Sequence, residues 1–325
     1  MEKCLSFNFS ITSTRDWIFR QTFYSAGLRP SLTHLPDGTT MQCWVPHHPA
    51  PHKPSLLLLH GFGANAMWQW SDQLRPFFLS SFNIYVPDLL FFGDSVTTRP
   101  DRSESFQARS VMALMESMGV LRMSVVGISY GGFVGYSMAA QFKEAVERLV
   151  LCSAGVCFEE RDLKEGLFPV SDVEEAASLL VPQTPEKMRE LVKGTFHKPW
   201  WPLPTWFPND IIDVDSPLLT LFFQDYVHVM CKEHAEEKRD LIRAILKDRK
   251  HLNLPKIAQP TLIVWGEHDQ LFPLELAHRL KRHLEGNSRL VIIKNAGHGV
   301  HLEKPKVFYK LLKGFLTDTP SQAFY

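Results

Sequence analysis

The sequence predicts an α/β fold in which a mostly parallel central sheet is flanked by helices and interrupted by a helical insertion. Two observations lead to this prediction. Short apolar runs bounded by turn signals recur from Met41 onward and alternate with stretches of helical periodicity. After Cys152 the alternation stops over a long, charged, helical stretch, and it resumes at Thr261. Because strands that alternate with helices pair in parallel and are covered on both faces, one sheet with an insertion is expected.

The individual elements follow from the same patterns. Strands are expected at 41–45, 55–59, 84–86, 123–126, 149–152, 261–265 and 289–294. Helices are expected at 106–118, 132–142, 172–180, 185–194, 234–248, 273–285 and 305–315. We therefore predict a core made of residues 1–154 and 255–325 and a helical cap made of residues 155–254. Within the cap, 198–208 is too rich in proline for a helix and predicts an irregular loop.

Composition excludes several classes of function. Lys and Arg together number 35, as do Asp and Glu, so no electrostatic basis for nucleic-acid binding exists. The 5 cysteines are scattered and lack the spacing of a zinc or redox motif, which indicates reduced thiols in a cytoplasmic protein. We expect no metal and no cofactor. Nothing in the sequence specifies an oligomeric state.

The apolar runs are far shorter than the roughly 20 residues that a membrane-spanning helix needs. We therefore expect no transmembrane segment. Aromatic and apolar residues are crowded near the start of the chain, at Trp17, Ile18, Phe19, Phe23 and Tyr24. Packing of these side chains against the core is the favoured interpretation, and peripheral membrane contact through an amphipathic helix is the alternative.

A candidate nucleophile lies in the segment Gly127-Ile-Ser129-Tyr-Gly131. A serine hydroxyl attacks an acyl carbon only with an adjacent base and with donors for the developing oxyanion. Short Gly-x-Ser-x-Gly segments also occur as simple turns. Here the segment follows an expected strand and precedes an expected helix, as a strained nucleophile elbow requires. Ser129 is therefore the expected nucleophile.

The candidate oxyanion donors are two backbone amides. The amide of Tyr130 directly follows the nucleophile. The second donor is expected in the loop His60-Gly-Phe62-Gly63, which follows an earlier strand, and we assign it to Phe62. A turn without catalytic function is the alternative for this loop, and His60 itself is interpreted as a packing residue.

The base and its orienting acid are expected after the last two strands. Asp269 in Trp265-Gly-Glu267-His-Asp269 is preferred over Glu267 as the acid. His298, between two glycines, is preferred over His301 as the base. The chain order Ser129, Asp269, His298 matches that of α/β-hydrolases and differs from the orders of trypsin-like and subtilisin-like proteases.

These segments together resemble the α/β-hydrolase superfamily, through LLLLHGFG, VPDLLFFGDS, VVGISYGG, LIVWGEHDQLFP and NAGHGVHLEKP. The resemblance extends from about residue 40 to the end of the chain and implies a helical cap after the sixth strand. It also implies that Asp88 and Asp94 are structural. The insertion, the segment Trp68-Gln-Trp70 and the ending HGVHLEKP are most similar to plant lipase-like and monoacylglycerol-lipase-like enzymes. A serine esterase or lipase that acts on an apolar ester is therefore expected.

Two alternatives stay open at this point. An enzyme of the same fold could cleave another bond, such as a carbon–carbon bond or an N-terminal proline peptide, because contacts in the cap set the specificity. A ligand receptor of the same fold would keep the three residues and turn over slowly, with movement of the cap. Epoxide hydrolases and dehalogenases of this fold use an aspartate at the elbow, which Ser129 contradicts.

Overall fold

The computed structural model of the chain describes residues 10–198, 217–247, 249–250 and 254–317. The strands are β1 (Leu28–His34), β2 (Thr40–Pro46), β3 (Ser55–Leu59), β4 (Asn83–Pro87), β5 (Met123–Ile128), β6 (Val146–Cys152), β7 (Thr261–Gly266) and β8 (Ser288–Ile293). The helices before β6 are α1 (Ile11–Ser25), α2 (Ala66–Trp70), η1 (Ser71–Gln73), α3 (Pro76–Ser81), α4 (Glu104–Ser117) and α5 (Tyr130–Gln141).

Helices also fill the described part of the chain between β6 and β7, and they follow β7 and β8. Those between β6 and β7 are α6 (Glu160–Lys164), α7 (Val173–Leu180), α8 (Pro185–Thr195), α9 (Pro217–Tyr226), the π-helix η3 (Val227–Cys231) and α10 (Ala235–Leu246). The later ones are α11 (Leu274–Leu284), η5 (Glu285–Asn287), α12 (Val300–Glu303) and α13 (Pro305–Thr317).

The sheet has 8 strands in the order β1-β2-β4-β3-β5-β6-β7-β8. Strand β2 runs antiparallel to β1 and β4, whereas the pairs from β4 to β8 are parallel. This arrangement confirms the predicted fold class, with a helical insertion after the sixth strand. The domain boundaries at residues 154 and 255 stay a prediction.

Strand β1 was not expected from the sequence. It contains Pro30 and is exposed or half-buried at all but its first residue, whereas central strands such as β5 and β7 are buried along their whole length. Proline is tolerated there because β1 lies at the edge of the sheet and pairs only with β2. The strong apolar runs that predicted the other strands arise from burial on both faces, which an edge strand does not have.

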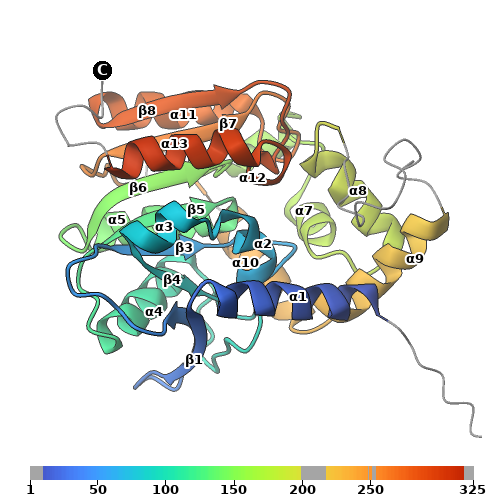
Figure 1. Cartoon of the computed structure of the whole chain (residues 1–325). Coiled ribbons are helices and arrows are strands. Elements are labelled where there is room, and N and C mark those ends of the chain that lie inside the picture. The colour runs from blue at the N-terminus through green and yellow to red at the C-terminus, as the bar shows by residue number, and fades with distance from the viewer. Residues whose placement is uncertain (1–9, 199–216, 248, 251–253, 318–325) are drawn as a thin grey trace, which may run out of the picture.

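Two apolar layers cover the two faces of the sheet. On β5, Val125 packs in a layer that includes α4, α5 and α11, and Val126 packs in the opposite layer with α2, α3 and α13. A third apolar cluster joins α7, α8 and α9 to Leu271, which follows β7. In Figure 1 these three helices lie together beyond one end of the sheet, beside the N-terminal end of α1.

The N-terminal aromatic residues divide between the core and the surface. Phe23 is fully buried and Phe19 packs against the same layer, but Trp17 is 60% exposed and Ile18 is 49% exposed. The prediction that these side chains pack against the core is therefore correct for one face of α1 and wrong for the other. The difference arises because α1 lies on the surface of the molecule, where a helix buries only one face.

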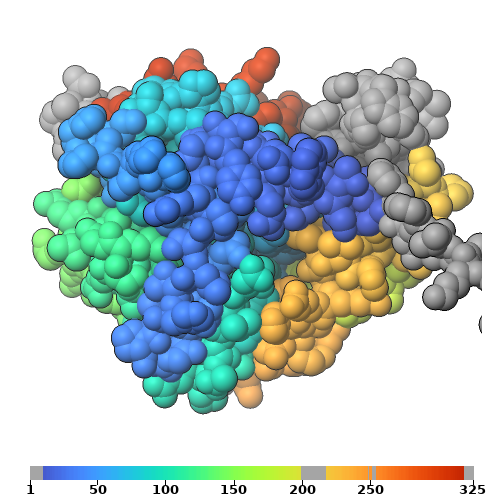
Figure 2. Space-filling model, turned by 60° about the horizontal axis from the view of Figure 1, so that its bottom comes forward, coloured from blue at the N-terminus to red at the C-terminus, as the bar shows by residue number. Residues whose placement is uncertain are grey.

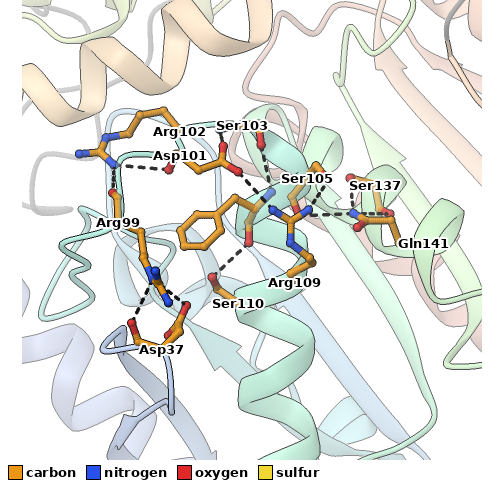
Figure 3. Close-up of polar contacts among 11 residues, drawn as sticks. Asp37, Arg99, Asp101, Arg102, Ser103, Ser105, Arg109, Ser110, Ser137 and Gln141 are labelled. Carbon is orange, nitrogen blue, oxygen red and sulfur yellow. Dashed lines mark hydrogen bonds and ion pairs between the residues drawn. The ribbon is translucent and has the colours of Figure 1, made fainter.

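Helix α5, which follows the candidate nucleophile, is tied at its far end to the start of α4 (Figure 3). Gln141 donates to the Ser105 carbonyl at 3.4 Å and to the Ser137 hydroxyl at 2.9 Å. Asp101 accepts the amide of Ser103, the N-cap of α4, at 2.9 Å, and forms an ion pair with Arg109 at 3.2 Å. These contacts fix two neighbouring helices that cover the same face of the sheet.

None of the helices formed by the described residues combines the length and apolar character that crossing a bilayer requires.

A buried ion pair joins the insertion to the core. Asp162 of α6 is 1% exposed, and both of its carboxylate oxygens accept from the Arg279 guanidinium of α11 at 2.8 Å. Removing one partner of a buried pair leaves the other charge without compensation, which costs about 3 kcal/mol or more.

We expect Arg279→Met to lower the free energy of unfolding by about 3 kcal/mol, measured by urea denaturation. Arg282→Met is the matched control, because Arg282 is 64% exposed and pairs with Glu275 on the surface of the same helix. That variant should change stability by less than about 1 kcal/mol. Equal effects of the two substitutions would show that the buried pair does not stabilise the junction.

Candidate functional site

Ser129 occupies a strained turn between β5 and α5. Its φ of 52° and ψ of −119° are unusual for a residue with a side chain, as the nucleophile elbow requires. The turn brings α5 close to β3, and a Cβ atom at Gly131 would lie 2.4 Å from the Leu59 carbonyl oxygen. Only glycine fits at that position, so the motif has a steric reason in the structure.

The structure brings His298 and Asp269 together. The Nδ1 atom of His298 lies 2.9 Å from Asp269 Oδ2 and 3.1 Å from Oδ1. Because a carboxylate only accepts hydrogen bonds, Nδ1 carries a proton, and in the neutral ring Nε2 then keeps its lone pair. Both residues are more than nine-tenths buried, with exposures of 7% for His298 and 6% for Asp269.

Backbone contacts hold this pair in place. Asp269 Oδ1 also accepts the amides of Leu271 at 3.0 Å and Phe272 at 2.8 Å. The loop after β7 is joined to the loop after β8 by the His268 amide, which donates to the Ala296 carbonyl at 2.9 Å. The carboxylate and the imidazole are therefore fixed relative to each other by the backbone.

The rejected alternatives lie in other arrangements. Glu267 accepts the Asn295 amide at 3.1 Å and faces His268 at 3.5 Å, rather than His298. His301 contacts Gln69 at 2.9 Å. The structure thus pairs Asp269 with His298, as the sequence predicted, and does not bring Glu267 or His301 into that pair.

The loop with the candidate oxyanion donors is held by His60. His60 Nδ1 donates to the Gly61 carbonyl at 2.8 Å, and Nε2 accepts the Leu89 amide at 3.0 Å. Burial, the largest cause, lowers the pKa of His60 to about 4. In a trans peptide the carbonyl and the next amide point in opposite directions, so fixing the Gly61 carbonyl also fixes the amide of Phe62. His60 is therefore more than the packing residue that the sequence indicated.

The two residues assigned as oxyanion donors are neighbours. The rings of Phe62 and Tyr130 pack edge to face with centroids 4.9 Å apart, and Phe62 also packs edge to face on Phe92 at 5.2 Å. The side chain of Phe62 thus connects its own loop to the start of α5. Tyr130 is fully buried, and this burial raises the pKa of its hydroxyl.

Asp88 occupies the structural position that the resemblance implied. It is buried and accepts the Ala66 amide at 2.8 Å and the Gln42 side chain at 3.2 Å. Burial is the largest cause that raises the pKa of Asp88, to about 7. The Ala66 contact fixes the start of α2 next to the oxyanion loop.

Two cavities meet at Ser129 and His298. The larger one has a volume of about 170 Å³, and the smaller one, about 40 Å³, has otherwise apolar walls. Walls of the larger cavity come from α1, α2, the oxyanion loop, α8 and α9, through residues that include Arg15, Phe19, Phe62, Trp68, Met188, Leu191, Val192 and Tyr226. A site of this kind accepts an apolar ligand with its reactive carbon at the serine.

Sequence reasoning missed the contribution of α1 and of Gln69 to this cavity. Arg15 and Phe19 of α1 line it, and the Trp68 indole donates to Asp16 of α1 at 3.0 Å. The aromatic crowding near the N-terminus was the available signal. Of the irregular loop that was expected at 198–208, residues 199–208 lie outside the described residues.

Comparison with known proteins defines the class of the chain. The model of the α/β hydrolase fold family matches residues 54–305, and the chain belongs to this family. Among curated relatives, monoacylglycerol lipase abhd6-A of Xenopus laevis is 30% identical over 295 residues, covering 86% of this chain and 80% of its own.

Two solved structures are also similar. A membrane phospholipase A, described as a bacterial virulence factor, is 25% identical with a TM-score of 0.71, and the match covers 94% of this chain and 91% of the phospholipase. An esterase from Exiguobacterium antarcticum is 19% identical with a TM-score of 0.70, covering 89% of this chain and 100% of the esterase, and supports the fold alone.

Proposed function

We propose that this protein is a serine hydrolase that cleaves carboxylic esters of lipids, of the monoacylglycerol kind, through an acyl-enzyme formed at Ser129. The single observation that carries the proposal is the buried Asp269–His298 pair, which shares a cavity with a serine held at an elbow. Family membership supports ester hydrolysis, and the activity named for the 30% identical relative supports a monoacylglycerol as substrate.

The geometry supports a role for each residue. Asp269 keeps the proton of His298 on Nδ1, so Nε2 is free to take the proton of the Ser129 hydroxyl as its oxygen attacks the ester carbon. The amides of Phe62 and Tyr130 stabilise the oxyanion. The carbon–oxygen bond to the alcohol then breaks, and His298 returns its proton to the leaving alcohol. Water, activated in the same way, releases the fatty acid and restores the serine.

We expect Ser129→Ala to lower kcat on a short-chain ester by at least about 10⁴-fold and to abolish labelling by an organophosphorus probe. Ser137→Ala, on the same helix and part of the Gln141 contact, is the matched control and should keep both activities. Stopped-assay kinetics with excess ester should show many turnovers per enzyme. Undiminished hydrolysis by the Ser129 variant, or a single turnover by the native protein, would contradict the proposal.

The larger cavity is the one that can take a lipid chain. Val192 of α8 is 3% exposed and lines only this cavity, and Leu179 of α7 lines only the smaller one. A bulkier side chain at either position must extend into the cavity, because the closely packed core around it has no spare volume. The cavity then accepts only a shorter group.

We expect Val192→Phe to lower kcat/KM for an octanoate ester by about 10-fold or more, while an acetate ester is affected much less. Leu179→Phe is the control and should leave the ratio between the two esters close to that of the native protein. Steady-state kinetics on both esters measure this. A change of chain-length preference in the Leu179 variant alone would place the chain in the smaller cavity instead.

Peripheral contact with a membrane is part of the proposal, and it is supported by α1 and α9. Their outward faces expose Ile11, Trp17, Ile18, Leu218 and Leu221, at 41%, 60%, 49%, 49% and 64%. Figure 2 shows α1 across this face of the molecule with α9 beside its N-terminal end. The inner faces of the same two helices line the cavity of Ser129, so a lipid bound here is close to the site.

The two helices form one surface because they are joined. Asp225 of α9 accepts the Thr12 amide at 2.8 Å and the Ser10 hydroxyl at 3.1 Å at the start of α1. The most exposed side chains of α1 carry no charge, and the apolar ones among them can enter the headgroup region of a membrane. We place the protein on the cytoplasmic side of a membrane, in keeping with the free, buried thiols of Cys43, Cys152, Cys157 and Cys231.

We expect the double variant Ile18→Ser, Leu221→Ser to bind phosphatidylcholine vesicles several-fold more weakly than the native protein, measured by co-sedimentation. Leu121→Ser is the control, because Leu121 is 65% exposed and lies between α4 and β5. Its vesicle binding should match that of the native protein. An equal loss in both variants, or no binding by the native protein, would refute the membrane contact.

A further inference from the structure

We infer that Gln69 and His301 act together as positioning residues that fix the oxyanion loop against Ser129. Gln69 lies on α2 and His301 on α12, the short helix that follows the candidate base His298. The two side chains meet in the wall of the larger cavity. The inference rests on the proposed function and adds to it two residues that do not take part in the proton transfers.

The contacts of Gln69 define the orientation of its amide. Its Oε1 accepts the amide of Gly61 at 2.5 Å, and its Nε2 lies 2.9 Å from His301 Nε2. A backbone amide only donates, so the atom that faces Gly61 must be the oxygen. The amino group of Gln69 therefore donates to His301, and His301 Nε2 must be an acceptor with its proton on Nδ1.

His301 is suited to this single task. It is 2% exposed, and burial followed by the neighbouring His298 lowers its pKa to about 3, so the ring is neutral. Its other nitrogen, Nδ1, has no hydrogen-bond partner among the described residues. A buried donor without a partner is unfavourable. The polar contact that His301 does make with a side chain is the one to Gln69, and that contact prevents the Gln69 amide from turning its amino group toward Gly61.

Gly61 is the point at which this pair affects the nucleophile. A Cβ atom placed on Gly61 would lie 2.9 Å from Ser129 Cβ, so the loop and the nucleophile are in close contact. Gln69 holds the amide of Gly61 and His60 holds its carbonyl. Because both the amide and the carbonyl of Gly61 are fixed, the amide of Phe62 is held in one orientation. Loss of the Gln69 contact frees one side of this loop and weakens stabilisation of the oxyanion.

The test compares kinetics with the binding of a trifluoromethyl ketone, which forms a tetrahedral oxyanion at the serine. We expect Gln69→Leu to lower kcat by about 10- to 100-fold with a small change in KM, and to weaken ketone binding by a similar factor. His301→Leu should have a smaller effect of the same kind. His301→Gln, unlike His301→Leu, should keep kcat close to native, because the amide oxygen of the new side chain can accept a hydrogen bond from Gln69. The double variant Gln69→Leu, His301→Leu should lose no more than Gln69→Leu alone.

The matched control is Gln73→Leu. Gln73 is buried and donates to the His301 carbonyl at 3.3 Å, so it supports the same segment without touching the loop. It should lower the melting temperature and leave kcat close to native. If Gln69→Leu leaves kcat within 2-fold of native, or if the losses of the two single variants add in the double variant, the inference is wrong. Should a leucine variant fail to fold, Gln69→Ala and His301→Ala give the same comparison.

Failure of the positioning role is distinct from failure of the proposed function. The former would be seen in an active enzyme whose ketone binding does not depend on Gln69. The latter would be seen as hydrolysis that does not depend on Ser129.

Discussion

The site depends on one constraint, which is that the neighbouring strands β3, β5, β6, β7 and β8 all run parallel. Parallel strands end at the same edge of a sheet, so the loops that follow them converge there. The oxyanion loop follows β3, Ser129 follows β5, Asp269 follows β7 and His298 follows β8. Residues that are far apart in the chain thus come together because the strands that precede them are neighbours in the sheet. The central strands β5 and β7, which carry these loops, are buried along their whole length.

The sequence allowed much of this arrangement to be predicted. The central strands were recognisable because burial on both faces demands continuous apolar runs, as in 55–59 and 261–265. His298 could be chosen over His301 from its glycine neighbours, and Asp269 over Glu267 from its place just before the expected helix at 273–285. The structure pairs the same two residues. Their catalytic roles stay proposals.

Other features could not be predicted, for physical reasons. Strand β1 lacks an apolar pattern because it lies at an edge. The roles of His60 and Gln69 depend on which backbone group each side chain contacts. These contacts join separate elements, and their distance in space could not be predicted from the sequence. The amphipathic division of α1 could be suspected from its aromatic residues. Which of them face the core depends on where the helix lies on the sheet.

The participation of α1 in the cavity wall determines when the cavity can form during synthesis of the protein. The wall includes Arg15 near the start of the chain and Leu302 near its end. During synthesis on the ribosome, the N-terminal helix emerges long before α8, α9 and the segment of His298. The cavity therefore cannot be complete in any shorter nascent chain, and hydrolytic activity should arise only when nearly the whole protein has folded. A site assembled in this way is incomplete in truncated products of translation.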